Sequence, residues 1–441
     1  AVLDGKIPFE EMVYTEGEER TQYFVRNIRV EFGTTLVHSR KISIRAMIEM
    51  EVGCENLIEE ETAVDLESSA SIYKKQKPVN LLKLHTAKKD TYRIKEEITI
   101  PGTKESIGQV LLTDITGRKL EVRAAQDELL LRGELQIFCM YLSEEGKTDW
   151  LEQSVPYEGR IECSGATEGM YYDVQHALED TLADVRMDED GEMRIIGIEG
   201  TVSLRINLYE EEELNLLEDL YSLEQKVSYQ TREAVYEELL LKNQSKCKIV
   251  ENLSLPELKD DVLQICHSSG SVQIEHVETR AEKQGGILIE GILHVSFLYL
   301  KADDALPFGN WQGMVPFSYL LECPDMPKDV RYQLSNRVEQ ISVTMTGSDS
   351  VEVKAVLDFD VFLRKEVPMQ VITEVSLEET DREELAKKPG IVGYMVKSGD
   401  DLWTLAKQYM TTEESIRQIN HLENGKIKPG DKLIICKEIG M

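Results

Sequence analysis

Three stretches of the chain place an apolar residue at every second position, with mostly polar residues between. The apolar members are Ile42, Ile44, Ala46, Ile48, Met50 and Val52 in the first stretch, Ile196, Ile198, Gly200, Val202, Leu204 and Ile206 in the second, and Val351, Val353, Ala355, Leu357, Phe359 and Val361 in the third. A period of two sends successive side chains to opposite faces of a strand. Each stretch therefore predicts a β-strand with one face in a core and the other in water.

A shorter alternating segment precedes each stretch and predicts a partner strand. These segments begin at Ile28, Ala183 and Ile341, and polar or glycine-containing turns such as residues 188–191 separate them from the longer strands. A strand, a tight turn and a second strand form the pattern of a β-hairpin. We therefore expect three copies of one hairpin.

Each hairpin belongs to a longer repeat, which a short proline-containing motif marks. The motif is Ile7-Pro8-Phe9 in the first copy, Val155-Pro156-Tyr157 in the second and Val315-Pro316-Phe317 in the third. Ahead of the motif, the second and third copies contain an additional front half, with alternating strands at 129–141 and 287–299. The first copy has no equivalent, so we expect the chain to begin inside its first repeat.

Between the repeats the pattern changes to helical spacing. Leu214, Leu217 and Leu220 follow this spacing within residues 210–225, which predicts a helical linker, with an extended bridge as the alternative. A polar stretch at 376–388 predicts another helix.

The predicted fold class is mainly β, with tandem antiparallel β-sandwich or barrel-like repeats joined by helical linkers and followed by a small α/β segment. The predicted domains are a truncated first repeat with its linker at 1–72, a second repeat at 73–230, a third repeat at 231–388 and a separate segment at 391–437.

Charge and cysteine content narrow the classes of function. The chain has 50 Lys and Arg against 82 Asp and Glu, a net charge of −32 that repels phosphate backbones and anionic lipid headgroups. We therefore expect no nucleic-acid partner, and no apolar stretch reaches the roughly 20 residues of a membrane helix, so no direct membrane insertion is expected. Seven cysteines without zinc-type spacing predict reduced thiols in a cytosolic protein.

The sequence offers no convincing catalytic site. Two copies of one β-rich unit account for residues from about 86 to 375, and none of the seven histidines recurs between the two complete repeats. A catalytic side chain would be expected to recur if both copies were active. We therefore expect no enzyme activity, no cofactor and no metal site.

The segment from Ile391 onward follows a different pattern. It predicts a strand, a tight turn at Gly399, two helices and a closing strand after the Pro429-Gly430 turn. Asp401 precedes the first helix, where its carboxylate is expected to accept backbone N–H bonds as an N-cap. From residue 391 to the end, seven basic and seven acidic residues cancel, so the net charge lies in the repeats.

This segment closely resembles a LysM domain. The shared motifs are Tyr-x-Val-x-x-Gly-Asp-x-Leu-Trp-x-Leu-Ala, Ile-x-x-x-Asn-x-Leu and Ile-x-x-Gly-Asp-x-Leu-x-Ile, in order over residues 394–435. LysM domains bind glycans that contain N-acetylglucosamine, and the resemblance implies a groove between loops 398–403 and 419–427. The implied partner-binding or glycan-binding residues are Ser398, Gly399, Asp400, Asp401, Leu402, Trp403, Asn420, His421, Leu422 and Lys426.

Other roles stay open for several of these residues. Sugar rings stack on aromatic side chains, and Trp403 is the candidate near the groove, yet its place in a helix makes burial an equal alternative. Asn420 is also expected to bond loop backbone. Leu402, Trp403 and Leu422 form the expected apolar centre of a docking surface.

The upstream repeats resemble the SPOCS domains of endospore-forming Firmicutes, through the proline motif and the Gly-x-Leu strands at 133–141 and 291–299. Several such repeats followed by one LysM domain is the arrangement of clostridial spore-morphogenesis proteins. The resemblance implies a non-enzymatic coat-assembly factor in the mother-cell cytoplasm, at the forespore surface. Its implied partner is stage IV sporulation protein A, the ATPase of the coat basement layer, docked through the LysM domain. The SPOCS repeats would then mediate self-association into a homo-oligomer, or further coat contacts.

A cell-wall or cortex protein that binds peptidoglycan through the LysM domain is the alternative. It shares the motif and differs in compartment. An adaptor that docks a protein inside the mother cell is the favoured interpretation.

Overall fold

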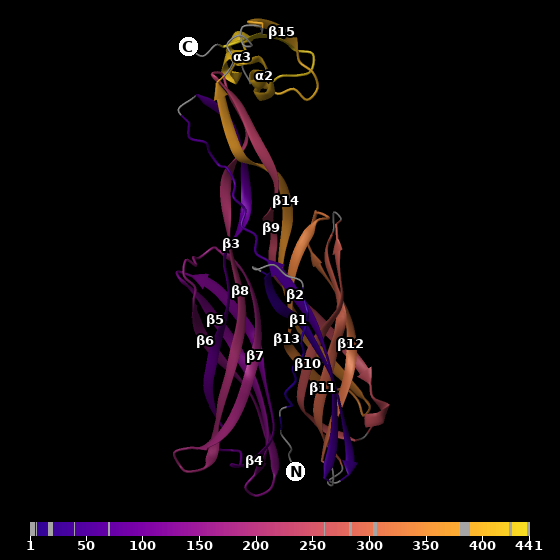
Figure 1. The fold of residues 1–441 in the computed structure, drawn as a ribbon. Coiled ribbons are helices and arrows are strands. Elements are labelled where there is room, and N and C mark those ends of the chain that lie inside the picture. Colours follow the sequence, from indigo (N-terminus) through magenta and orange to yellow (C-terminus); the bar gives the residue numbers. More distant parts are fainter. Residues whose placement is uncertain are drawn as a thin grey trace. The chain divides into compact units, whose positions relative to one another are not determined.

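The protein is mainly β, as the alternating pattern predicts (Figure 1). The computed structural model describes residues 5, 7–15, 21–38, 40–68, 71–259, 261–281, 285–302, 307–379, 389–422 and 426–438. The strands of the repeats are β1 (Thr21–His38), β2 (Lys41–Asn56), β3 (Ile72–Thr99), β4 (Ile107–Ala125), β5 (Glu128–Ser143), β6 (Thr148–Glu162), β7 (Tyr171–Met187), β8 (Met193–Ser222), β9 (Gln225–Ser254), β10 (Val262–Arg280), β11 (Gly286–Lys301), β12 (Phe308–Glu322), β13 (Val330–Met345) and β14 (Ser350–Glu379). A short 3-10 helix covers Pro256–Leu258.

Each complete repeat is a sandwich of two three-stranded sheets. In the second repeat, one sheet has the order β4-β5-β6 and the other β3-β8-β7. One apolar cluster joins Leu135 and Ile137 of β5 to Ile196 and Ile206 of β8, so the two sheets face each other across a common core. The third repeat reproduces this arrangement with β10-β11-β12 against β13-β14-β9 and a second core.

The proline motif lies on an edge strand, opposite a glycine of the central strand. Tyr157 of β6 pairs with Gly133 of β5, and Phe317 of β12 pairs with Gly291 of β11. An added Cβ at Gly133 would lie 2.5 Å from the Tyr157 ring, so the aromatic ring covers the space above the glycine. An edge strand also tolerates proline, because one side of its backbone needs no ladder partner. The recurring motif is therefore a packing device of the sheet.

The first hairpin forms as predicted, but its apolar face is not in a core. β1 and β2 pair antiparallel, with Val30 opposite Ile48 and Phe32 opposite Ala46. Val30 and Phe32 are exposed, so the expectation of a buried face is wrong for this copy. The first proline motif lies outside any strand, and its Ile7 and Phe9 are exposed. Among the described residues, β1 and β2 form a two-stranded sheet by themselves, without the three-stranded partner sheet of the complete repeats.

The predicted helical linker is wrong, because β8 continues as a strand through residues 210–222. Leu216, Leu217, Leu220 and Tyr221 are all buried there. A strand covered on both faces loses strict alternation, which leaves spacings that also fit a helix. At 376–388, β14 extends to Glu379, so its first four residues are strand, while the rest lies outside the described residues.

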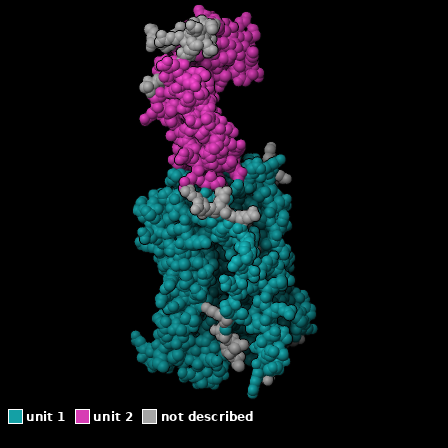
Figure 2. All heavy atoms as spheres, viewed as in Figure 1, with its two compact units in different colours: residues 1–57, 83–210, 239–365 teal, residues 58–82, 211–238, 366–441 magenta. Residues whose placement is uncertain are grey.

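The chain divides into two compact units, shown in Figure 2. The first contains residues 1–57, 83–210 and 239–365, and the second contains 58–82, 211–238 and 366–441. We call the described part of 58–82, 211–238 and 366–379 the β-arm. The β-arm has its own apolar cluster, which includes Leu217, Leu220 and Ile372. These units are groups of residues in mutual contact, and each contains pieces of more than one repeat. They therefore do not test the predicted domain boundaries, which stay a prediction.

The C-terminal segment adopts the predicted order of strand, helix, helix and strand. Its elements are β15 (Ile391–Met395), α2 (Leu402–Tyr409), α3 (Glu413–Ile419) and β16 (Lys432–Cys436), with β15 and β16 antiparallel. Leu405, Ala406 and Ile416 are buried between the helices and the strands. In the described part of the chain, no helix has the length and apolar character needed to cross a bilayer.

Candidate functional site

The first loop of the C-terminal segment is shaped by local side-chain bonds. Gly399 has φ 93°, a left-handed conformation that favours glycine. The Asp400 carboxylate accepts hydrogen bonds from the Tyr394 hydroxyl at 2.8 Å and from the Lys397 backbone N–H at 2.7 Å. Asp401 caps α2 by accepting from the Thr404 N–H at 2.7 Å, which confirms the predicted N-cap.

The second loop begins near Asn420, whose side-chain amide makes three hydrogen bonds to backbone groups of the segment. The Asn420 amide nitrogen donates to the carbonyl oxygens of Ile416 and Ile434, and its oxygen accepts from the Ile434 N–H at 2.7 Å. Asn420 therefore ties α3 to β16. His421 follows in the left-handed region with φ 52° and is exposed, as is Lys426. Residues 423–425 of this loop lie outside the described residues.

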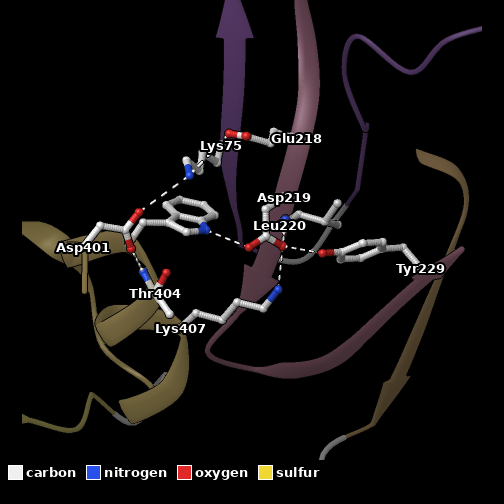
Figure 3. A network of polar contacts seen from close by, with 9 residues as sticks. Lys75, Glu218, Asp219, Leu220, Tyr229, Asp401, Thr404 and Lys407 are labelled. Atoms are coloured by element: carbon white, nitrogen blue, oxygen red, sulfur yellow. Dashed lines mark hydrogen bonds and ion pairs between the residues drawn. The ribbon is translucent and has the colours of Figure 1, made fainter. Parts of the chain in front are cut away.

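The β-arm contacts this segment through Asp219, which lies on β8 (Figure 3). Its carboxylate accepts a hydrogen bond from Trp403 Nε1 at 2.8 Å, one from the Tyr229 hydroxyl at 2.7 Å and one from Lys407 Nζ. The Leu220 N–H donates to the same carboxylate. Burial opposes its charge, but hydrogen bonds from Lys407, Trp403 and Tyr229 hold the pKa of Asp219 below its ordinary value.

A second ion pair links the N-cap of α2 to the β-arm. Lys75 of β3 lies 3.6 Å from Asp401 and 3.3 Å from Glu218 (Figure 3). Burial opposes the charge of Lys75, but the two carboxylates raise its pKa above the ordinary value. All three side chains are partly exposed, and ion pairs of this kind contribute little to stability.

An apolar contact joins the segment to the β-arm more firmly. Tyr221 is 5% exposed and meets Trp403 edge to face, with ring centroids 4.9 Å apart. It also stacks on Tyr73, with ring centroids 5.1 Å apart, and its hydroxyl donates to the Thr411 carbonyl at 2.9 Å. Tyr221 and Leu223 belong to the same apolar cluster as the core of the segment. The segment and the β-arm therefore share one core.

These contacts divide the predicted site residues into those that are engaged within the chain and those that are exposed. Leu402 is buried in the core, Leu422 is half-buried against it, and Asp400, Asp401, Trp403 and Asn420 have the internal partners described above. Ser398, Gly399, His421 and Lys426 are exposed. The expected apolar centre at Leu402, Trp403 and Leu422 is thus largely used within the chain.

Sequence reasoning missed the β-arm residues of this contact, although one signal was present. Asp219-Leu220 stands 37 residues before Pro256, and Asp65-Leu66 stands 36 residues before Pro101. In both places the aspartate carboxylate accepts from the following N–H at 2.8 Å. The spacing shows that the linkers repeat, but it does not show that one of them contacts the segment.

The described residues contain no group of three or more His, Cys, Asp or Glu side chains arranged to hold a metal ion. The cysteines at 54, 139, 163, 247, 266, 323 and 436 are all free. Burial raises the pKa of the Cys139 thiol to about 11 and thereby disfavours the reactive thiolate.

Protein-family models match both parts of the chain. A SipL SPOCS domain matches residues 106–186 and 261–346, which lie in the two complete sandwiches, and a LysM domain matches residues 394–435. No curated protein and no solved structure matches the chain. The chain therefore combines sporulation-associated SPOCS domains with one LysM domain, and both are binding domains.

Proposed function

We propose that this chain is a non-enzymatic scaffold for spore coat assembly, and that its LysM domain docks a coat protein at the forespore surface, in the mother-cell cytoplasm. The SPOCS repeats mediate self-association or further coat contacts. The partner that the domain arrangement suggests is stage IV sporulation protein A, the ATPase of the coat basement layer.

The engagement of Trp403 by the β-arm supports protein docking over glycan binding. A glycan site typically offers an aromatic face for the apolar side of a sugar ring, and Trp403 is the aromatic residue of the predicted groove loops. Its ring packs on Tyr221 and its N–H donates to Asp219. The groups left at the surface of the loops include Ser398, His421 and Lys426, which are polar and suit the polar contacts of a transient protein interface.

Peptidoglycan binding is the second candidate, because the LysM match itself favours it. In that case the sugar would contact the same exposed loops without stacking on Trp403. The two candidates differ in ligand chemistry, so they can be separated by direct binding measurements.

The test uses the full chain and two ligands, purified stage IV sporulation protein A and insoluble peptidoglycan sacculi. We expect the ATPase to bind in biolayer interferometry, and the sacculi not to deplete the chain on pelleting. Lys426→Glu should weaken docking about tenfold by reversing an exposed charge at the loop. Lys95→Glu, the same charge change at an exposed site in the first unit, is the control and should bind as the unaltered chain does.

Retention on sacculi without binding to the ATPase would replace the docking proposal by the glycan one. Equal losses in the Lys426 and Lys95 variants would show a general charge effect and would remove the loop from the site.

A further inference from the structure

The β-arm is built from equivalent pieces of the three repeats. Leu66, Leu220 and Val375 stand 154 and 155 residues apart, and all three pack in the apolar cluster of the β-arm. A second set in this cluster has the same spacing: Ala63, Leu217 and Ile372. Equivalent positions of the repeats therefore meet in one core.

The positions that contact the LysM domain depart from this equivalence. At the same spacing, Tyr221 corresponds to Glu67 and Ser376, and Tyr73 corresponds to Ser228. Tyr73 and Tyr221 stack with ring centroids 5.1 Å apart, and both pack in the core of the LysM domain. Because the other copies have no aromatic residue at these positions, the tyrosine pair serves the LysM contact and not the packing of the β-arm.

Four β-arm side chains contact the LysM domain, and we call them the LysM seat: Tyr73, Lys75, Asp219 and Tyr221. At the start of α2, Asp219 accepts a hydrogen bond from Trp403 Nε1 at 2.8 Å. Lys75 lies 3.6 Å from Asp401, whose carboxylate caps the same helix (Figure 3). The LysM seat therefore holds the first turn of α2, where the first predicted groove loop ends.

The LysM seat also holds the other end of α2. Lys407 Nζ donates to Asp219, and the Tyr221 hydroxyl donates to the Thr411 carbonyl at 2.9 Å. Thr411 directly precedes the N-cap of α3, and α3 leads into the second predicted groove loop. Both loops therefore adjoin helices that the LysM seat keeps in place.

We propose that Asp219 and Tyr221 are positioning residues of the docking site. They hold α2 and the start of α3, and with these helices the ends of both groove loops, so that the partner meets residues already in place. Binding to a preorganised surface avoids the entropic cost of ordering it, and the gain appears mainly as slower dissociation. This inference rests on the proposed function, since it needs a partner that docks on the loops, and it gives the β-arm a role in that docking.

Dissociation of the full chain from purified stage IV sporulation protein A, followed by biolayer interferometry, tests the proposal. We expect Tyr221→Ser to dissociate about tenfold faster, because it removes the ring from the LysM seat. Tyr221→Phe keeps the ring against Trp403 and loses the bond to Thr411, so it should recover most of the difference. Glu67→Ser, at the equivalent exposed position of the other linker, is the control and should dissociate as the unaltered chain does.

The dissociation rate separates positioning from a simple loss of folded protein. A variant that only unfolds more often gives a weaker signal, but the molecules that do bind leave at the ordinary rate. A weaker signal for Tyr221→Ser with an unchanged dissociation rate would therefore overturn the proposal.

Hydrogen exchange of the free chain tests the LysM seat without a partner. Amides of α2 should exchange faster in Tyr221→Ser than in Tyr221→Phe, while amides of β5 in the first unit exchange equally in both. Equal exchange of α2 in the two variants would overturn the proposal, whether or not the ATPase binds. Failure of the unaltered chain to bind would overturn the proposed docking function, and the exchange of α2 would still decide whether the LysM seat positions the helix.

Discussion

Asp219 is the residue on which the polar contact between the β-arm and the LysM domain converges. It accepts bonds from Trp403 and Lys407 of α2 and from Tyr229 of β9. Hydrogen bonds to an ionised acceptor are stronger than neutral ones, and removing the acceptor leaves several donors unpaired. A single substitution at Asp219 should therefore test the contact between the β-arm and the LysM domain separately from the folding of either part.

We expect Asp219→Asn to destabilise the second unit by about 1–3 kcal/mol, because a neutral amide cannot accept all of these bonds. The pKa of Asp219 is lowered in the folded chain, so its stabilising contribution is present above the unfolded pKa and is lost as the pH falls through the folded pKa. The difference between variant and unaltered chain should therefore shrink below about pH 4. Urea unfolding followed by tryptophan fluorescence measures it.

The matched control is Asp65→Asn, the same change at the equivalent position of the other linker. Asp65 is more than half exposed and pairs with Lys74, so this variant should unfold like the unaltered chain. Equal losses at both positions would contradict a special role for the LysM contact.

Asp173 on β7 is a buried carboxyl that opposes folding at neutral pH. Burial raises its pKa to about 6, although Lys242 and Arg205 partly offset that effect, and its Oδ2 has no hydrogen-bond partner among the described residues. Because the folded pKa is raised, the carboxylate costs stability increasingly as the pH rises from about 4 to about 6, and the cost is constant above that range.

We expect Asp173→Asn to stabilise the first unit at about pH 7 by roughly 3 kcal/mol, since the amide is uncharged. The gain should disappear near about pH 4, where the carboxyl is neutral in both states. Asp184→Asn on the same strand is the control, because that carboxylate is exposed and pairs with Arg186. The midpoints of urea unfolding at both pH values measure the gain in stability. An Asp173→Asn protein that is less stable than the unaltered chain at about pH 7 would show that the Asp173 carboxylate does not oppose folding.

At the scale of elements, the glycine and aromatic pairing explains why the proline motif recurs. Gly291 of β11 faces Phe317 of β12, and an added Cβ would lie 2.3 Å from the Gln273 carbonyl oxygen of β10. Backbone in a paired strand cannot move away as a surface side chain can. The pairing of β11 with β10 on one side and with β12 on the other therefore requires a residue without a side chain at position 291.

We expect Gly291→Ala to destabilise the third repeat by about 1–3 kcal/mol through this clash. Gly117→Ala in β4 is the control, because the nearest atom to its Cβ would be 3.8 Å away, an ordinary contact. Thermal unfolding by circular dichroism compares the two variants. A Gly291→Ala chain as stable as the control would show that the sheet yields at this point.

The strands were predictable where one face is buried and were missed where both are. Alternation at Val351 to Val361 specifies a strand, because only a period of two fits a covered face and a wet face. In the β-arm, Leu216 and Leu217 are consecutive and both buried, so local spacing no longer distinguishes strand from helix. The Gly399 turn and the Asp401 cap are local features and were predictable. The contact of Trp403 with Asp219 joins residues 184 positions apart, and no local pattern contains it.

At the scale of the whole molecule, the acidic repeats and the near-neutral elements differ in charge. The net charge of −32 lies in the repeats, whereas the LysM segment is balanced and the β1–β2 hairpin is near neutral. Long-range repulsion between the acidic repeats opposes any association of such chains. The molecule should therefore associate where local concentration or ionic strength offsets its charge.

The self-association that the proposed function assigns to the SPOCS repeats should accordingly strengthen with salt. Screening shortens the range of repulsion from about 30 Å at 0.01 M to about 3 Å at 1 M ionic strength, whereas apolar packing is not weakened by sodium chloride. We expect the dissociation constant for self-association to fall as sodium chloride rises, as measured by sedimentation velocity of the full chain. A constant independent of salt would show that charge does not control assembly, and one that rises with salt would assign the interface to ion pairs, because only attractive charge contacts are weakened by screening.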